Sequence, residues 1–366
     1  MYVPFNDLSR IHKPILSKSI RKLEETVLSN DLILSNDIKE FEIEFSKFTN
    51  QKYTVTCANG TDAIELILLG IGVQKGDEVI VPTNSFIATA LAVVRTGATP
   101  IFVDNNENYL IKVDEISKKI TKKTKAVIGV NLYGQMCDVI SLKELAKKYN
   151  LFFIEDAAQS HGALKGKLNV GDNSIAAAYS FYPGKNLGGW GDGGAITTNN
   201  KNLYKKLLKI RNVGSSKKYI HDLIGYNSRL NPLNGIVLKL KLKNLEEYNH
   251  ERNIIASKYL DAFSNEKNLI LPNVEKNNYH VWHLFVIRVK NRNKVIKIAA
   301  KHGVQLVIHY PIPIHQQKSF INHIQYKQKF NNADRFKNQL VSLPIFPQMK
   351  NSEIDHVIKV IKKIIN

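Results

Sequence analysis

A lysine in a glycine-rich loop is the residue of this chain whose setting first suggests chemistry. Lys185 follows the apolar segment 176–181 and precedes five glycines within the seven positions 188–194. Glycines let the backbone approach a ligand closely, and a lysine whose amine loses its proton can form a Schiff base with a carbonyl compound. A surface turn with a solvated lysine is the competing interpretation, and the fragment alone leaves both open.

A carboxylate follows a second apolar segment. Asp156 comes directly after the segment 151–155. An acid at the end of a buried strand is partly desolvated, so it needs a cation or a hydrogen-bond donor as partner. Aspartates at strand ends also commonly cap the helix that follows, and for this fragment alone the cap is the favoured interpretation.

A third fragment could bind a phosphate. The segment Cys57-Ala58-Asn59-Gly60-Thr61-Asp62-Ala63 joins a strand-like run to a helical pattern. The N-terminus of a helix offers free N–H groups and the positive end of a dipole, which together bind anions. This signal is weak because many helices begin in this way, and Asp62 could equally serve as a helix cap.

Together the three fragments supply an amine, a carboxylate and a phosphate site. Pyridoxal 5'-phosphate (PLP) needs all three, because a lysine captures its aldehyde, an acid keeps its ring nitrogen protonated and an anion site anchors its phosphate. Few other small molecules need this combination. The sequence therefore predicts a PLP site that contains Lys185, Asp156 and the residues around Gly60.

Strands that alternate with helices would bring these fragments to one edge of a sheet. Strand-like runs occupy 54–57, 78–81, 100–103, 125–131, 151–155, 176–181 and 194–198, and helical patterns occupy 62–70, 85–95, 141–149 and 201–211. This alternation predicts an α/β fold with a largely parallel sheet, in which ligands collect at the carboxyl ends of the strands.

The last third of the chain has a different pattern. We expect a long helix over 235–263, a strand over 282–289, a helix over 292–302, a strand over 304–309 and a terminal helix over 352–365. Ser352 is the expected cap of that last helix. The pattern predicts a large cofactor-binding domain over residues 1–244 and a small α+β domain over residues 245–366.

Composition excludes several classes of protein. The 366 residues carry a formal charge of +20 but no apolar run of eighteen residues, so we expect no membrane span. The N-terminal residues lack the pattern of a secretory signal. Cys57 and Cys137 lack disulfide or zinc spacing, so we expect no metal site and a reducing cytoplasm. The basic pairs are scattered along the chain, which argues against nucleic-acid binding.

The chain resembles the DegT/DnrJ/EryC1/StrS sugar aminotransferases, which have the fold type I architecture with a seven-stranded, mostly parallel sheet. The resemblance covers nearly the whole chain and rests on segments 59–63, 76–82, 132–135, 155–162, 182–188, 191–195 and 225–229. It departs at Gly184, where many relatives have threonine, and at Trp190, where a smaller residue is common. Both departures bear on substrate fit and neither removes a catalytic group.

The resemblance assigns roles to individual residues. It implies that Lys185 forms the Schiff base, that Asp156 pairs with the ring nitrogen of PLP and that Gln159 bonds the ring hydroxyl. Phe86 would stack on the ring, the alternative being a core aromatic on the helix 85–95. Other implied contacts go to the phosphate: Gly60, Thr61 and Ser180 from the same subunit, and Asn227 from the neighbouring subunit. The last contact implies a homodimer with shared active sites.

The resemblance also implies a reaction. L-glutamate would give its amine and leave as 2-oxoglutarate, and a nucleotide-linked keto-sugar would accept the amine in a pathway to a deoxyamino sugar, such as one for lipopolysaccharide or an S-layer glycan. Segments 182–188 and 309–316 are similar to those of 3-aminating members, which favours a dTDP-linked 3-keto-6-deoxyhexose. The expected substrate contacts are Tyr182, His309, Tyr310 and His315, although structural roles for both histidines stay open.

Alternatives within and outside this class remain. Amination at C4, or of a UDP-linked sugar, would use the same residues. A PLP-dependent sugar dehydratase is disfavoured, because the known deoxygenating members carry histidine in place of the lysine. A regulator that has lost its catalytic function is disfavoured by the complete cofactor set.

Overall fold

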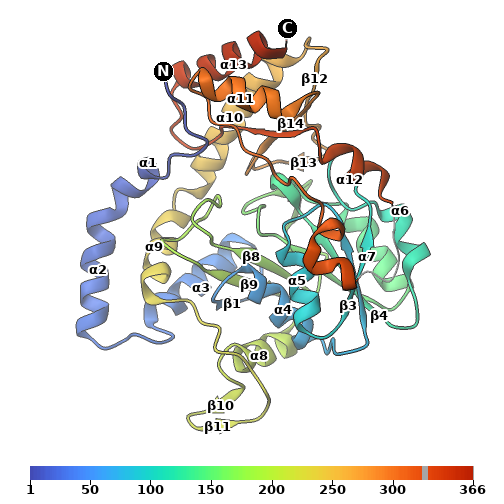
Figure 1. Cartoon of the computed structure of the whole chain (residues 1–366). Coiled ribbons are helices and arrows are strands. Elements are labelled where there is room, and N and C mark those ends of the chain that lie inside the picture. The colour runs from blue at the N-terminus through green and yellow to red at the C-terminus, as the bar shows by residue number, and fades with distance from the viewer. Residues whose placement is uncertain (324–328, 366) are drawn as a thin grey trace.

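A seven-stranded sheet forms the centre of the computed structural model, which describes residues 1–323 and 329–365 (Figure 1). The strand order is β1-β9-β8-β5-β4-β2-β3. Five neighbouring strands are parallel, and β9 runs antiparallel to both of its neighbours. The strands are β1 Tyr53–Cys57, β2 Glu78–Pro82, β3 Thr99–Val103, β4 Thr124–Val130, β5 Phe152–Asp156, β8 Ala176–Ser180 and β9 Gly194–Thr198.

This sheet confirms the predicted α/β class. Every one of its strands begins and ends within one residue of the predicted segment. The strands are recognisable because both faces of the sheet are covered, so they read as nearly continuous apolar runs. Asp156 ends β5 and Ser180 ends β8, and these two strands are parallel neighbours. Their carboxyl ends therefore meet at one edge of the sheet.

Helices pack against the strands of the large sheet. They are α3 Asn36–Phe48, α4 Gly60–Gly70, α5 Ala88–Arg95, α7 Val139–Lys148 and α8 Lys201–Ile210. Four were predicted, although α5 begins three residues later than expected. α3 and the preceding helices α1 Ser9–His12 and α2 Leu16–Leu28 were not predicted. The short helices α6 Val113–Ile116 and α12 Asn331–Phe336 lie in connections.

The predicted long helix over 235–263 is two helices. α9 Pro232–Leu242 and α10 Leu245–Phe263 are separated at residues 243 and 244. Asn231 caps α9 by accepting a hydrogen bond from the N–H of Asn234 at 2.8 Å. The sequence does not reveal this break, because the apolar periodicity continues through it and the two residues between the helices, Lys243 and Asn244, are neither glycine nor proline.

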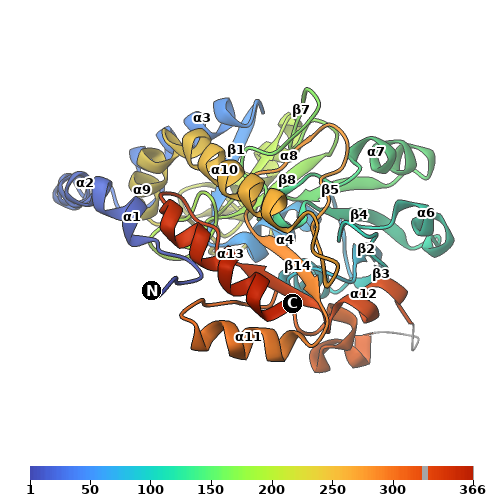
Figure 2. The ribbon, with the colours of Figure 1, turned by 90° about the horizontal axis from the view of Figure 1, so that it is seen from above.

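A second hydrophobic cluster lies beyond the large sheet, at the top of Figure 1. A small antiparallel sheet, β12 Leu269–Ile270, β14 Phe285–Val289 and β15 Leu340–Leu343, packs there with α11 Arg292–Lys301 and α13 Asn351–Ile365. The N-terminal segment lies beside these helices (Figure 2), where Val3 pairs with Val304. α10 contributes Leu245 to the large cluster and Tyr259 to the small one. A division after residue 244 therefore stays a prediction.

Two expectations for the small sheet region are wrong. The segment 304–309 forms no strand and makes only isolated bridges, from Val304 to Val3 and from Val307 to Ser342. Each neighbouring segment offers one paired residue rather than a continuous edge. Ser352 lies inside α13, which begins at Asn351, so it is not the cap.

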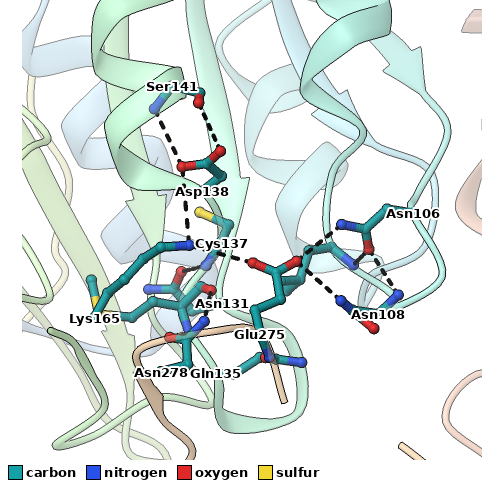
Figure 3. A network of polar contacts seen from close by, with 12 residues as sticks. Asn106, Asn108, Asn131, Gln135, Cys137, Asp138, Ser141, Lys165, Glu275 and Asn278 are labelled. Carbon is teal, nitrogen blue, oxygen red and sulfur yellow. Dashed lines mark hydrogen bonds and ion pairs between the residues drawn. The ribbon is translucent and has the colours of Figure 1, made fainter. Parts of the chain in front are cut away.

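A network of hydrogen bonds around Glu275, which we call the polar clamp, joins the segment before β14 to the part of the chain that forms the large sheet (Figure 3). The Glu275 carboxylate accepts hydrogen bonds from Asn106 and Asn108, both at 3.2 Å, and from the Lys165 ammonium at 3.3 Å. The N–H of Glu275 donates to Gln135 at 3.1 Å. The clamp stands beside a three-stranded sheet that mixes both parts, made of β6 Leu164–Lys165, β7 Leu168–Asn169 and β13 Asn278–Tyr279. It fixes the segment before β14 on the large sheet.

A hairpin extends from the body at the bottom of Figure 1. It consists of β10 Ser215–Lys217 and β11 Ile220–His221 and precedes Asn227. No helix in the described part of the chain is long and apolar enough to cross a membrane.

Candidate active site

Asp156 is a buried carboxylate at the edge of the sheet, only 5% exposed. It accepts hydrogen bonds from the Thr89 hydroxyl at 2.7 Å and from the N–H of Ala158 at 3.2 Å. Burial raises its pKa, while these two hydrogen bonds and the charge of Lys185 oppose the rise. No helix begins in the residues that follow, up to β8, so the interpretation as a helix cap is wrong.

Lys185 lies in the loop between β8 and β9, partly buried and in the field of Asp156. Burial lowers the pKa of Lys185 to about 8, and the carboxylate of Asp156 opposes that shift. An amine with this pKa is partly deprotonated near neutral pH, which a nucleophile or a general base requires. The interpretation as a solvated surface lysine is wrong.

Three buried histidines lie within range of the charge of Lys185, and their lowered pKa values keep them neutral near pH 7. Burial, followed by the charge of Lys185, lowers the pKa of His161 to about 3 and that of His309 to about 4. The same two causes place the pKa of His283 well below its usual value. His309 was predicted as a site residue. His161 and His283 were missed, although His161 lies within the segment 155–162 that carries the family resemblance.

The start of α4 is the place where the sequence predicts an anion site. Asn59 caps the helix by accepting a hydrogen bond from the N–H of Asp62 at 2.8 Å, so Asp62 is not the cap. The Asp62 carboxylate instead accepts from the Ser228 hydroxyl at 2.7 Å. A Cβ on Gly60 would lie 2.7 Å from the Cβ of Ser180, which shows that α4 begins directly against the end of β8. Thr61 follows at the first turn, half-buried.

Gln159, a predicted cofactor contact, is hydrogen-bonded to Tyr310, a predicted substrate contact. Its amide nitrogen donates to the Tyr310 hydroxyl at 3.0 Å, and its oxygen accepts from the N–H of Tyr133 at 2.7 Å. The ring of Phe86 lies 5.7 Å from the ring of Tyr310. Phe86 precedes α5 and is 54% exposed, so it is not a core aromatic on that helix. Its exposure is compatible with the stacking role that the family resemblance implies.

The remaining predicted contacts lie in different settings. His309 bonds the Ser342 hydroxyl at 2.8 Å, and its carbonyl accepts from the Tyr133 hydroxyl. Tyr182 is 59% exposed beside Ser180. His315, in the 3-10 helix Ile314–Gln316, bonds Thr83, and its ring lies 4.6 Å from the ring of Phe330 at an interplanar angle of 59°. These contacts of His315 fasten its segment to the large sheet, and none of them is with Lys185 or Asp156.

Asn227 lies apart from Lys185 in the sequence and is exposed. It pairs with Asn212 in an isolated bridge at the base of the hairpin. Its neighbour Ser228 bonds both Asp62 and the N–H of Ala58. Asn227 is therefore held close to the start of α4, on the exposed surface of the chain.

The arrangement fits PLP. The buried carboxylate of Asp156 has no cation partner among the described ion pairs, and Lys185 is the one cation whose charge acts on it. A protonated ring nitrogen would satisfy this carboxylate. Gly60 lets the start of α4 approach Ser180 closely, which brings the N–H groups of the helix N-terminus and the Ser180 hydroxyl together for a phosphate, and Lys185 supplies the amine.

The comparisons with known proteins agree with this geometry. Residues 14–362 match the DegT/DnrJ/EryC1/StrS aminotransferase family. A dTDP-3-amino-3,6-dideoxy-alpha-D-galactopyranose transaminase of Aneurinibacillus thermoaerophilus is 42% identical over 362 residues, which cover 99% of each chain.

Two solved structures extend the likeness to the fold. The DesV structure of Streptomyces venezuelae superposes with a TM-score of 0.96 at 35% identity, covering 99% of this chain and 98% of that one. The NtdA structure of Bacillus subtilis, with bound cofactor PMP, gives 0.93 at 31% identity and covers 100% of this chain and 85% of that one.

These matches confirm the predicted fold class, the predicted enzyme class and PLP as the cofactor of this class. The chain belongs to the DegT/DnrJ/EryC1/StrS aminotransferase family.

Proposed function

We propose that this enzyme transfers the amine of L-glutamate to C3 of a dTDP-linked 3-keto-6-deoxyhexose, with Lys185 and Asp156 as its catalytic residues. The observation that carries the proposal is a lysine of pKa about 8 in the field of a buried carboxylate at the edge of the sheet. Bound PLP supplies an electron sink for the charge that develops at the reacting carbon.

Lys185 holds the cofactor and, once released, moves the proton. Its amine would take a proton from the α-carbon of glutamate in the first half-reaction and would deliver a proton to the reacting carbon of the sugar in the second. A pKa near 8 suits both directions, because the amine can accept and release a proton near neutral pH. The neutral histidines beside it leave Lys185 as the group that titrates.

Asp156 acts through its negative charge, which keeps the ring nitrogen protonated. Thr89 orients the carboxylate by its hydrogen bond of 2.7 Å. We assign Gln159 to the ring hydroxyl, Phe86 to the ring face, and Gly60, Thr61 and Ser180 to the phosphate. Because one pocket serves both substrates in turn, the kinetics are ping-pong.

The sugar contacts are proposed from position. His309 and Tyr310 lie beside Lys185 and Gln159, and Tyr182 is exposed at the start of the lysine loop. A site that bonds a sugar hydroxyl strongly disfavours analogues that lack it. His315 belongs to this group by sequence resemblance, while its contacts are those of a structural residue.

We also propose a homodimer with shared active sites, in which Asn227 reaches the partner's cofactor phosphate. Large apolar side chains are exposed in the hairpin and in the segment between it and Asn227, namely Tyr219 at 84% and Ile224 at 96%. Leu28 at the end of α2 is likewise 75% exposed, and α2 lies at the left edge of the molecule in Figure 1. Apolar surface of this kind marks protein interfaces. The free, buried cysteines Cys57 and Cys137 fit a cytoplasmic location.

The deciding experiment supplies matched dTDP-linked 3-keto and 4-keto sugars with L-glutamate and locates the new amine by NMR. Amination of the 3-keto compound alone supports the proposal. Turnover of the 4-keto compound alone would overturn the C3 assignment and leave the aminotransferase class intact. Parallel reactions with UDP-linked sugars test the nucleotide, for which the relative of Aneurinibacillus thermoaerophilus favours dTDP.

A further inference from the structure

A lysine of α9 is buried without a carboxylate partner. Lys241 is 2% exposed, and its ammonium donates to the carbonyl of Gly188 at 2.5 Å. Among the ion pairs of residues 1–323 and 329–365, none includes Lys241. Burial, with a contribution from Arg252, lowers the pKa of Lys241 to about 8. A buried ammonium is costly unless its hydrogen bonds are well formed.

The partner of Lys241 belongs to the loop that carries Lys185. Gly188 packs so closely on the start of this loop that a Cβ there would lie 2.2 Å from the carbonyl oxygen of Pro183. The N–H of Gly189 donates to the carbonyl of Phe181 at 2.8 Å. The loop thus folds back on itself, and Lys241 holds the point where it turns.

Two buried asparagines hold the loop on either side of Gly188. Asn234, also on α9, accepts from the N–H of Trp190 and donates to the carbonyl of Asp192, both at 2.8 Å. Asn186 donates to the Asn249 side chain on α10 and to the carbonyl of Val281, both at 2.8 Å. Lys185 therefore directly precedes two positions that are fixed by hydrogen bonds to other elements: the side chain of Asn186 and the carbonyl of Gly188. We call these two positions anchors of the loop.

An ammonium suits the anchor at Gly188 for a physical reason. A charge-assisted hydrogen bond to a carbonyl is about twice as strong as a neutral one. The four-carbon stem of Lys241 reaches the loop from α9, where Leu238 and Leu242 pack in the large core. For the stability of the core alone, an apolar residue at this position would cost less free energy of desolvation than a lysine. Retaining a cation here makes sense if the loop must not move.

We propose that Lys241 is a positioning residue, which fixes the loop through Gly188 and so holds the Lys185 amine at the reacting centre. This inference rests on the proposed role of Lys185. Misplacing a reactive group by a small distance slows a reaction strongly without weakening substrate binding to the same extent.

The test compares Lys241→Met, which removes the ammonium but keeps the length, with Lys243→Met. Lys243 is exposed at the end of the same helix, which makes it a matched control. In Lys241→Met we expect amide hydrogen exchange of residues 186–193 to be about tenfold faster, because an anchor is lost. We expect kcat to fall about 10- to 100-fold while KM changes less than about threefold. Lys243→Met should behave as the wild type, and Lys241→Arg should recover part of the rate.

Several outcomes would overturn the proposal. One is wild-type loop exchange and wild-type kcat in Lys241→Met. Another is faster exchange throughout the chain with no excess in residues 186–193, which would mean a merely structural role. If Lys241→Met does not fold, amide hydrogen exchange of the wild-type protein is the test. Exchange of residues 186–193 that is as fast as exchange of the hairpin β10–β11 would contradict a fixed loop. The exchange measurements need no turnover, so they remain valid if the proposed reaction is wrong.

Discussion

Replacing Asp156 with asparagine isolates the charge of this residue from its shape. The Asp156→Asn side chain keeps an oxygen for the N–H of Ala158, and the Thr89 hydroxyl can rotate to accept a hydrogen bond from the new amide. The side chain is nearly isosteric, so packing at this buried position is preserved. What is lost is the negative charge that faces Lys185 and the proposed ring nitrogen.

The magnitude follows from the burial of Asp156. Removing one partner of a buried, hydrogen-bonded charge pair costs about 3–5 kcal/mol. If this loss falls on the step that needs the protonated ring, the rate drops by roughly 100- to 5,000-fold, at about 1.4 kcal/mol per tenfold. The assay is rapid mixing of the holoenzyme with L-glutamate, in which the change in cofactor absorbance reports one half-reaction.

The same variant makes a second prediction, with a definite sign. Asp156 raises the pKa of Lys185 against the effect of burial. Without that carboxylate the pKa of Lys185 falls below about 8, so the pH profile for PLP capture by the apoenzyme moves to lower pH. Capture reports the fraction of Lys185 that carries no proton.

Glu155→Gln is the matched control. Glu155 precedes Asp156 on β5 and is fully buried, and its carboxylate accepts from Asn131 at 2.9 Å and from the N–H of Gly171 at 2.9 Å. Its variant should lose stability but keep a half-reaction rate within about threefold of the wild type. A near wild-type rate in Asp156→Asn, or an equal loss in Glu155→Gln, would refute the reasoning.

Three further predictions concern Lys185, Asn227 and Glu275. Capture of PLP by the wild-type apoenzyme should speed up as the pH rises through about 8, the pKa of Lys185, whereas Lys185→Ala should retain no cofactor after borohydride reduction. A mixture of Lys185→Ala with Asn227→Ala should regain activity through hybrid dimers if Asn227 serves the partner's site, and absence of rescue despite measured subunit exchange counts against sharing. Glu275→Ala removes the acceptor for Asn106, Asn108 and Lys165, so denaturant unfolding should show a loss of about 1–3 kcal/mol with little change in KM.

The strands of the large sheet were predictable because a strand that is buried on both faces has a nearly continuous run of apolar residues in the sequence. The helices before residue 50 were missed, although Ile38, Phe41 and Phe45 recur at helical spacing in α3 and could have revealed that helix. α2 buries only Ser19 and Thr26, so no apolar stripe of this helix lies in the core. The two-residue strands β6 and β7 are too short to show any alternation. The segment 304–309 has the residues of a strand but lacks a continuous partner, which only the tertiary structure reveals.

The proximity of the two residues that we propose as catalytic was predictable for a different reason. Asp156 and Lys185 each follow a strand-like run, and parallel strands deliver their carboxyl ends to one edge. The groups that tune the pair come from elsewhere. Thr89 is on α5, His283 precedes β14, and Lys241 is on α9. None of them stands in a local pattern that distinguishes it from an ordinary helix or loop residue.

The buried histidines explain how the site combines basic surroundings with a reactive lysine. If His161, His283 and His309 were protonated, their charges would compete with Lys185 for Asp156 and repel a protonated ring nitrogen. Burial instead lowers the pKa of all three imidazoles and keeps them neutral at physiological pH. They can still donate and accept hydrogen bonds, so they fill the site with polar groups without adding charge. With these imidazoles neutral, Lys185 stands beside the carboxylate of Asp156 as the group that can accept and release a proton near neutral pH, which suits the proton transfer that we propose for it.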